Sequence, residues 1–171
     1  MPDRGPFIQT YTGKYFYLND PRPEDIDIQD IAHALSNTCR FGGHSPHYYS
    51  VAEHSINVSK LVPPQFALWG LLHDSSEAYL PDIPSPFKPL FNFKEIEDRL
   101  LKAIIERFGL DWPMPVQVHV IDRNIVAEEA RQLWRRELEW TKDVPRLDIH
   151  VHSLSPGMIK DRFMERFEEL T

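Results

Sequence analysis

The sequence has little of what stabilises small secreted proteins or carries a chain across a membrane. It contains one cysteine, Cys39, in 171 residues, so an internal disulfide is excluded and a reducing compartment is favoured. No uncharged apolar run approaches the roughly 20 residues that span a bilayer. The first residues also lack the apolar core of a signal peptide. We therefore expect a cytoplasmic protein that has no membrane partner.

Basic residues are also too few for a broad nucleic-acid surface. The chain has 19 Lys and Arg against 26 Asp and Glu, a net charge of −7, so we expect no duplex nucleic acid as a partner. A small anion can still bind, because a metal ion and a few local Arg and Lys residues reverse the sign of the potential inside one cleft. Glycine is scarce, with 7 residues against 15 prolines, which indicates helices joined by short, rigid connections.

What the sequence does contain is a series of helical patterns. Its 171 residues, without a repeat or a long linker, predict a single domain that can bury a core. Residues 1–22 are expected to form an N-terminal extension with a short β-hairpin, residues 24–140 the core, and residues 155–171 a last helix. The fold class is therefore all-α, with five or six helices. Within the core, helices are predicted for residues 23–35, 50–61, 65–74, 92–109 and 116–140.

Four ionisable residues interrupt the apolar faces of these helices. His54 has valines three residues before and four after it, and Asp122 lies on a similar stripe. His73 and Asp74 end a helix that is apolar on every side. Burying a carboxylate on an apolar stripe is costly unless another group neutralises it.

Each of these residues alone has an ordinary interpretation, as a hydrogen-bonded core histidine or an ion-paired aspartate. Together, without an equal number of inward Arg or Lys residues, they favour a divalent cation as the neutralising group. Two imidazoles and two carboxylates suit one transition metal ion such as Mn, Fe, Co, Ni or Zn. The sequence does not decide between these metals.

Two further carboxylates lie close to this set in the sequence. Glu77 follows His73 by four residues, so on one continuous helix both would share a face. A carboxylate beside a metal can accept a proton from water, as hydrolysis requires. A solvated residue at the helix end is the alternative. Asp82 lies in the proline-rich segment LPDIPSPFKP and could support the same network.

The order His54, His73-Asp74 and Asp122 resembles the H…HD…D signature of the HD-domain phosphohydrolases. The resemblance extends over about residues 24–135, through CRFGGHSPHYYSVAEHSINVSKLV, LLHDSSEAYLPDIPSPFKP and IDRNIVAEEA. These segments are most similar to bacterial 5′-deoxynucleotidases and phage dATP triphosphohydrolases. A bacterial cytoplasm, or that of a phage host, is the location implied.

The resemblance implies a role for each matching position. The four metal ligands are His54, His73, Asp74 and Asp122. The catalytic carboxylates are Glu77, which activates the attacking water, and Asp82. The residues that match substrate contacts are Arg40 and Lys88 for the phosphates, and Phe41 and Pro86 for the two faces of the base. His44 is an additional donor near the phosphates. Phe41 stands where relatives carry tryptophan, which leaves the base preference open.

The expected activity is attack of water on the α-phosphate of a deoxynucleoside 5′-monophosphate or triphosphate, with dAMP and dATP as candidates, to release the deoxynucleoside. The resemblance implies one metal ion, because HD-domain enzymes with two metals need additional histidines between the HD pair and the final aspartate, and only His119 lies between Asp74 and Asp122. Two alternatives stay open: a nucleotide sensor with little catalysis, and a structural helical domain without metal. The last helix carries Ile159, Phe163 and Phe167 as an apolar stripe, which either packs against the core of its own chain or forms a contact in a homo-oligomer.

Overall fold

The structure is a computed structural model that describes residues 4–84, 86–91 and 94–171. Over these ranges the protein is mostly helical, and the one sheet there is a two-stranded hairpin. Among the described residues, no helix is both long and apolar enough to cross a membrane. The α-helices are α1 (Ile28–Asn37), α2 (Val51–Leu61), α3 (Ala67–Leu72), α4 (Lys94–Arg107), α5 (Val116–Trp134) and α6 (Pro156–Leu170).

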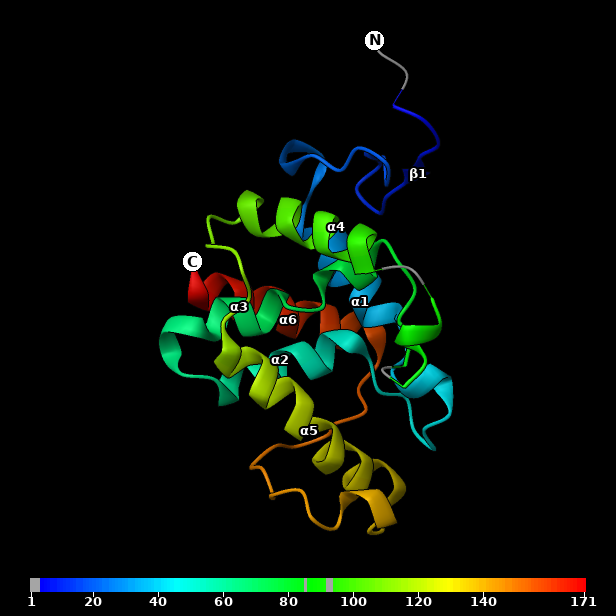
Figure 1. The fold of residues 1–171 in the computed structure, drawn as a ribbon, viewed down its shortest axis with the longest axis vertical. Helices are drawn as coiled ribbons and strands as arrows, with labels where there is room; N and C mark the ends of the chain where they lie inside the picture. Colours follow the sequence, from blue (N-terminus) through cyan, green and yellow to red (C-terminus); the bar gives the residue numbers. More distant parts are fainter. Residues whose placement is uncertain (1–3, 85, 92–93) are drawn as a thin grey trace.

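The helices pack around one hydrophobic core. Helix α2 packs closely against α3, and α1 packs against α6, so these four helices form the centre of the molecule. Figure 1 shows α4 above this centre, in the orientation drawn, and α5 below it. Fully buried Leu35, Val58, Leu72, Ile104 and Ile125 come from five different helices. This arrangement confirms the predicted all-α class.

The predicted N-terminal hairpin is present and small. Strand β1 (Ile8–Gln9) pairs antiparallel with β2 (Tyr15–Phe16). Gly13 in the connecting turn has a φ of 87°, which glycine adopts without strain. Phe16 is buried and its ring stacks on Tyr79, with 3.9 Å between ring centroids, so the hairpin is anchored to the core.

The predicted helix starts are partly right. The first helix does not open at Pro23, because a separate 3-10 turn (Pro23–Asp25) precedes it and Asp27 caps α1 by accepting from the backbone of Gln29 (3.0 Å). The helix predicted from residue 50 begins there, because Ser50 caps α2 and accepts from Glu53 N (3.1 Å). The predicted start of the next-to-last core helix, at residue 92, lies outside the described residues.

Two helices are shorter than predicted. Helix α5 ends at Trp134 and not at residue 140, because Arg135 adopts a left-handed conformation with φ 51°. Helix α3 ends at Leu72, and a 3-10 turn (Ser75–Ala78) follows. His73 and Glu77 therefore do not lie on one continuous helix, so the prediction that they share a helix face is wrong.

The close approach of α3 to α2 depends on Gly70. A Cβ atom at this position would lie 2.9 Å from Ser59 Cα and 3.1 Å from Ser59 N. Both are backbone atoms of α2, so the side chain of even an alanine would push the helices apart. Of the two histidines of the candidate site, His54 stands in α2 and His73 directly follows the end of α3.

We expect Gly70→Ala to lower the free energy of unfolding by roughly 1–3 kcal/mol, the usual cost of overpacking a core. Gly157→Ala is the matched control, because a Cβ atom there would meet nothing within 4 Å. It should leave stability unchanged or slightly raised, since alanine favours helix. Urea unfolding of both variants measures the difference. Equal stability of the two would contradict the close contact.

Candidate metal centre

Four predicted ligands converge from three parts of the fold. His54 stands in α2, His73 and Asp74 follow the end of α3, and Asp122 lies in α5. Each offers one ligand atom, and these four atoms all lie within 4.8 Å of one another. The imidazoles are buried, whereas the side chains of Asp74 and Asp122 are 18% and 36% exposed. Solvent therefore reaches the cluster from the carboxylate side.

The backbone and a buried carboxylate set the orientation of both rings. His73 Nδ1 donates to Gly70 O (2.8 Å), and His54 Nδ1 donates to Glu129 Oε1 (2.6 Å). Because both partners only accept, each Nδ1 carries a proton, and in the neutral form of each ring the lone pair is on Nε2. The two Nε2 atoms face each other at 3.2 Å.

The spacing of the cluster fits a metal ion. His54 Nε2 lies 3.1 Å from Asp122 Oδ1, and His73 Nε2 lies 3.3 Å from Asp74 Oδ2. Ligands at ordinary bond lengths around one tetrahedral ion are about 3.4 Å apart. Two facing lone pairs and two carboxylates require a positive charge between them, so the residues present fit a divalent cation.

Without a metal, protons take that role. Burial disfavours a charged His73, but Asp74 and Asp122 outweigh it and raise the pKa of His73 well above its usual value. Burial and Arg40 lower the pKa of His54, but Glu129 and Asp122 outweigh them and raise it. A metal ion must displace these protons to bind.

Arg40 is brought to the cluster by the loop that precedes α2. Cys39 and Ser50 form an antiparallel bridge, and Arg40 N donates to Tyr49 O (2.9 Å), which closes the loop next to the start of α2. The Arg40 side chain is only 12% exposed and its guanidinium lies 3.6 Å from Asp74 Oδ2. A fixed cation therefore stands beside the candidate metal position.

Glu77 and Lys88 form a second pair at the edge of the cluster. The 3-10 turn after Asp74 buries Glu77, with Glu77 N donating to Asp74 O (2.9 Å). Glu77 Oε1 lies 3.7 Å from Lys88 Nζ, while Oε2 is buried without a hydrogen-bond partner among the described residues. Burial and the nearby charges of Asp74 and Asp82 raise the pKa of Glu77 well above its usual value. Such a carboxylate binds a proton more readily than an ordinary glutamate does.

Asp82 shares this electrostatic environment. It is half-buried in the proline-rich segment, and burial together with the charge of Asp74 raises its pKa, against the opposing effect of Arg40. The structure therefore places Asp82 among the charges of the cluster. Its catalytic role stays a prediction.

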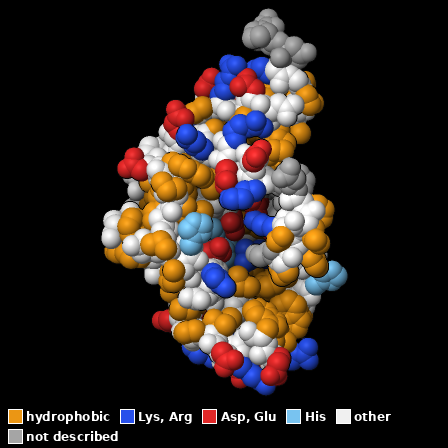
Figure 2. Space-filling view, in the orientation of Figure 1, with side chains coloured by type: hydrophobic (Ala, Val, Ile, Leu, Met, Phe, Trp, Pro, Cys, Tyr) orange, Lys and Arg blue, Asp and Glu red, His pale blue; other side chains and the backbone are white. Residues whose placement is uncertain are grey.

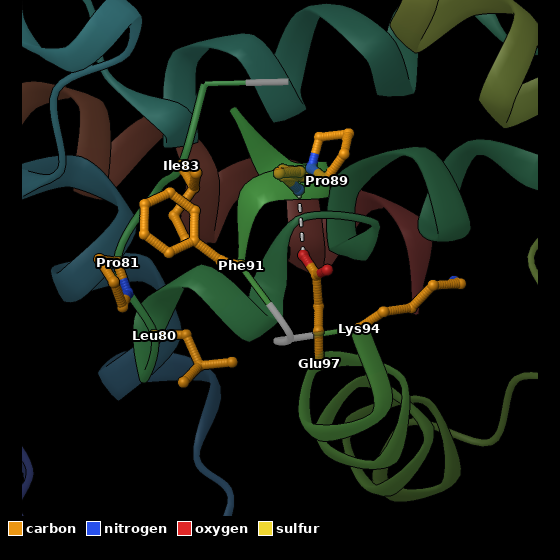
Figure 3. A pocket seen from close by; sticks show the side chains of 8 residues that line it. Leu80, Pro81, Ile83, Pro89, Phe91, Lys94 and Glu97 are labelled. Carbon is orange, nitrogen blue, oxygen red and sulfur yellow. Dashed lines mark hydrogen bonds and ion pairs between the residues drawn. The ribbon is translucent and has the colours of Figure 1, made fainter. Parts of the chain in front are cut away.

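A cavity of approximately 340 Å³ adjoins Lys88. Figure 3 shows Leu80, Ile83 and Phe91 on one side of it and Lys94 and Glu97 on the other, where the dashed line marks the bond of Lys88 Nζ to Glu97 Oε1 (3.1 Å). Its walls are mostly apolar, and Lys88 connects it to Glu77. On the face in Figure 2, acidic and basic side chains gather around a hollow near mid-height.

The predicted base contacts are less defined. Phe41 has a positive φ of 56° and packs edge-on against Trp134, with 5.3 Å between ring centroids. His44 is exposed and ends the turn that follows Phe41, and Pro86 is exposed in the proline-rich segment. That Phe41 and Pro86 cover the two faces of a base, and that His44 contacts phosphate, stay predictions.

Glu129 is a residue of this centre that was not predicted from the sequence. This carboxylate is fully buried in α5, accepts from His54 Nδ1 and from Tyr49 OH (2.7 Å), and lies 3.3 Å from the Arg40 guanidinium. A signal was available, because Glu129 follows Asp122 by seven residues, which is two helical turns on the same face.

Comparison with known proteins finds one relative along nearly the whole chain and another along part of it. No protein-family profile matches the chain. The uncharacterized protein YfdR of Escherichia coli K12 is 41% identical over 170 residues, which cover 96% of each chain. An uncharacterized protein of Rhodobacter capsulatus is 37% identical over 118 residues, 63% of this chain and 60% of that protein.

We expect Co²⁺ or Mn²⁺ to release protons when it binds at pH 7, because the raised pKa of His73 keeps that ring protonated in the metal-free protein. Affinity should fall as the pH is lowered, and proton release should vanish above the raised pKa. Calorimetry in two buffers of different ionisation enthalpy measures the protons released.

His119→Asn is the matched control, because His119 is exposed in the first turn of α5, outside the cluster. It should release as many protons as the wild type. Identical heats in both buffers for the wild type would contradict the protonated cluster.

Proposed function

The chain belongs to the family of the YfdR protein of Escherichia coli, and we propose that it is an HD-domain phosphohydrolase that cleaves deoxynucleotides at the α-phosphate. The observation that carries this proposal is the meeting of His54, His73, Asp74 and Asp122 beside the buried carboxylate of Glu77. The same residues carry the resemblance of the sequence to the HD-domain phosphohydrolases.

A divalent metal bound by His54, His73, Asp74 and Asp122 would supply Lewis acidity, which polarises phosphate and makes water more acidic. The transition metals named from the ligand types all fit this donor set. The ligand rings need no rearrangement to accept the ion, since hydrogen bonds at Nδ1 already fix both of them. The site is therefore preorganised for the group it would hold.

Glu77 is the proposed general base. A water oxygen attacks phosphorus, the bond from phosphorus to the 5′ oxygen breaks, and the water proton passes to Glu77 Oε2, which lacks a partner among the described residues. The 5′ oxygen takes up a proton from solvent and leaves as the hydroxyl of the deoxynucleoside, and Glu77 returns its proton to solvent, so that the step balances. A monophosphate yields phosphate and a triphosphate yields triphosphate by the same bond cleavage.

Two cations would bind the phosphate oxygens in this proposal. Arg40 stands beside Asp74, and Lys88 stands beside Glu77. An Arg fork and a Lys ammonium both suit phosphate. The mostly apolar cavity next to Lys88 has the size of a small-molecule site. Small phosphorylated molecules therefore fit this centre better than an extended nucleic acid does.

The first test is to incubate the Mn²⁺- or Co²⁺-loaded protein with each deoxynucleoside monophosphate and triphosphate and to separate the products by chromatography. We expect a deoxynucleoside to appear in at least one reaction, and the accompanying phosphate or triphosphate identifies the substrate. Protein that is verified to contain metal and releases no deoxynucleoside would contradict hydrolysis and leave a nucleotide sensor.

We expect Glu77→Gln to lower turnover at least about 100-fold, the usual contribution of a general base. Its metal content should match the wild type, because Glu77 is not among the four clustered ligand atoms. Glu106→Gln changes an exposed glutamate of α4 and should keep full activity. Turnover retained by Glu77→Gln would exclude Glu77 as the base.

A further inference from the structure

Glu129 is a buried charge that the proposed reaction does not use. It lies in α5, with its side chain fully inaccessible to solvent. A buried carboxylate is costly unless it is paired and hydrogen-bonded, so the groups that hold it indicate its role. Those groups belong to the candidate metal centre.

The two oxygens of Glu129 serve different partners. Oε1 accepts from His54 Nδ1 (2.6 Å) and from Tyr49 OH (2.7 Å). Oε2 lies 3.3 Å from an Arg40 guanidinium nitrogen. Asn57 Nδ2 donates to Tyr49 OH (3.3 Å), so the phenol hydroxyl is itself held in place.

We propose that Glu129 is a positioning residue that fixes His54 for metal binding and neutralises Arg40 beside the metal. This inference rests on the proposed metal-dependent function. By accepting from Nδ1, Glu129 sets the ring so that Nε2 points at His73 and Asp122. By pairing with Arg40, it allows a fixed cation to stand close to a divalent ion without repelling it.

These two effects can be separated by charge-matched double variants. In Arg40→Gln/Glu129→Gln both charges are removed, while the amide oxygen introduced at position 129 can still accept from His54. In Arg40→Gln/Glu129→Leu both charges are also removed, but the acceptor is lost. The pair therefore differs in whether position 129 offers an acceptor to His54 Nδ1 and to Tyr49 OH.

The readout is the dissociation constant of Co²⁺, measured by competition with a chromogenic chelator, together with the visible absorption spectrum of the bound Co²⁺. We expect the leucine double variant to bind Co²⁺ about 10–100-fold more weakly than the glutamine double variant, the usual effect of losing such a partner. Its spectrum should change, because the His54 ring is no longer fixed. The glutamine double variant should bind close to the wild-type value.

The single variant Glu129→Gln tests the charge. It keeps the acceptor but leaves Arg40 uncompensated, so it should bind Co²⁺ more weakly than Arg40→Gln/Glu129→Gln does. Glu129→Asp provides a variant that keeps the buried charge if the leucine variant does not fold. It withdraws the carboxylate by one methylene and should also weaken Co²⁺ binding.

Equal Co²⁺ affinity and identical spectra in the two double variants would overturn the positioning role. If Glu129→Asp is the variant measured, wild-type affinity overturns it as well. This result is distinct from failure of the proposed function. A wild type that binds Co²⁺ but hydrolyses nothing would reject the phosphohydrolase, while the predicted loss of affinity would still establish Glu129 as the residue that positions His54.

Discussion

The central constraint on this structure is electrostatic, because two imidazole nitrogens face each other at 3.2 Å between two carboxylates. Hydrogen bonds at Nδ1 leave both Nε2 lone pairs pointing into the same space. Lone pairs and anions at this spacing repel unless a cation lies among them, and burial makes the repulsion stronger. The fold therefore requires positive charge within this cluster. Protons supply that charge in the absence of metal, and a bound divalent ion would supply it in their place.

The rest of the fold serves to hold that point in place. Gly70 lets α3 approach the backbone of α2, which brings His73 to His54. The loop closed by the Cys39–Ser50 bridge carries Arg40 to the same region. Helix α5 contributes both Asp122 and, two turns later, the buried Glu129. Most of the side chains involved are positioned by helix packing and backbone hydrogen bonds, which is what a preorganised site requires.

The helical class, the hairpin and the four clustered residues were predicted from the sequence. The four residues could be recognised because each is a polar residue at a position where the helical period predicts an apolar one. The sequence also predicted that α5 continues to residue 140. The helix ends earlier, at Trp134, because Arg135 adopts a left-handed conformation, and an arginine at this position gives no sign of a helix end in the sequence as a glycine would. The position of Glu77 near the cluster was predicted on the assumption that one helix carries both His73 and Glu77. In the structure a 3-10 turn after Asp74 brings Glu77 to the cluster. Glu129 was overlooked because its partners, Tyr49 and His54, lie 80 and 75 residues away in the chain. Such contacts appear only once the helices are packed.

The most direct measurement is diffraction from crystals of the Co²⁺-loaded protein, with data collected on both sides of the cobalt absorption edge. We expect one strong anomalous peak, bonded to Nε2 of His54 and His73 and to oxygens of Asp74 and Asp122. The Nδ1 atoms should keep their bonds to Glu129 and Gly70. A peak elsewhere, or a fully metal-free cluster in crystals saturated with Co²⁺, would contradict the claim that this arrangement exists to hold a metal.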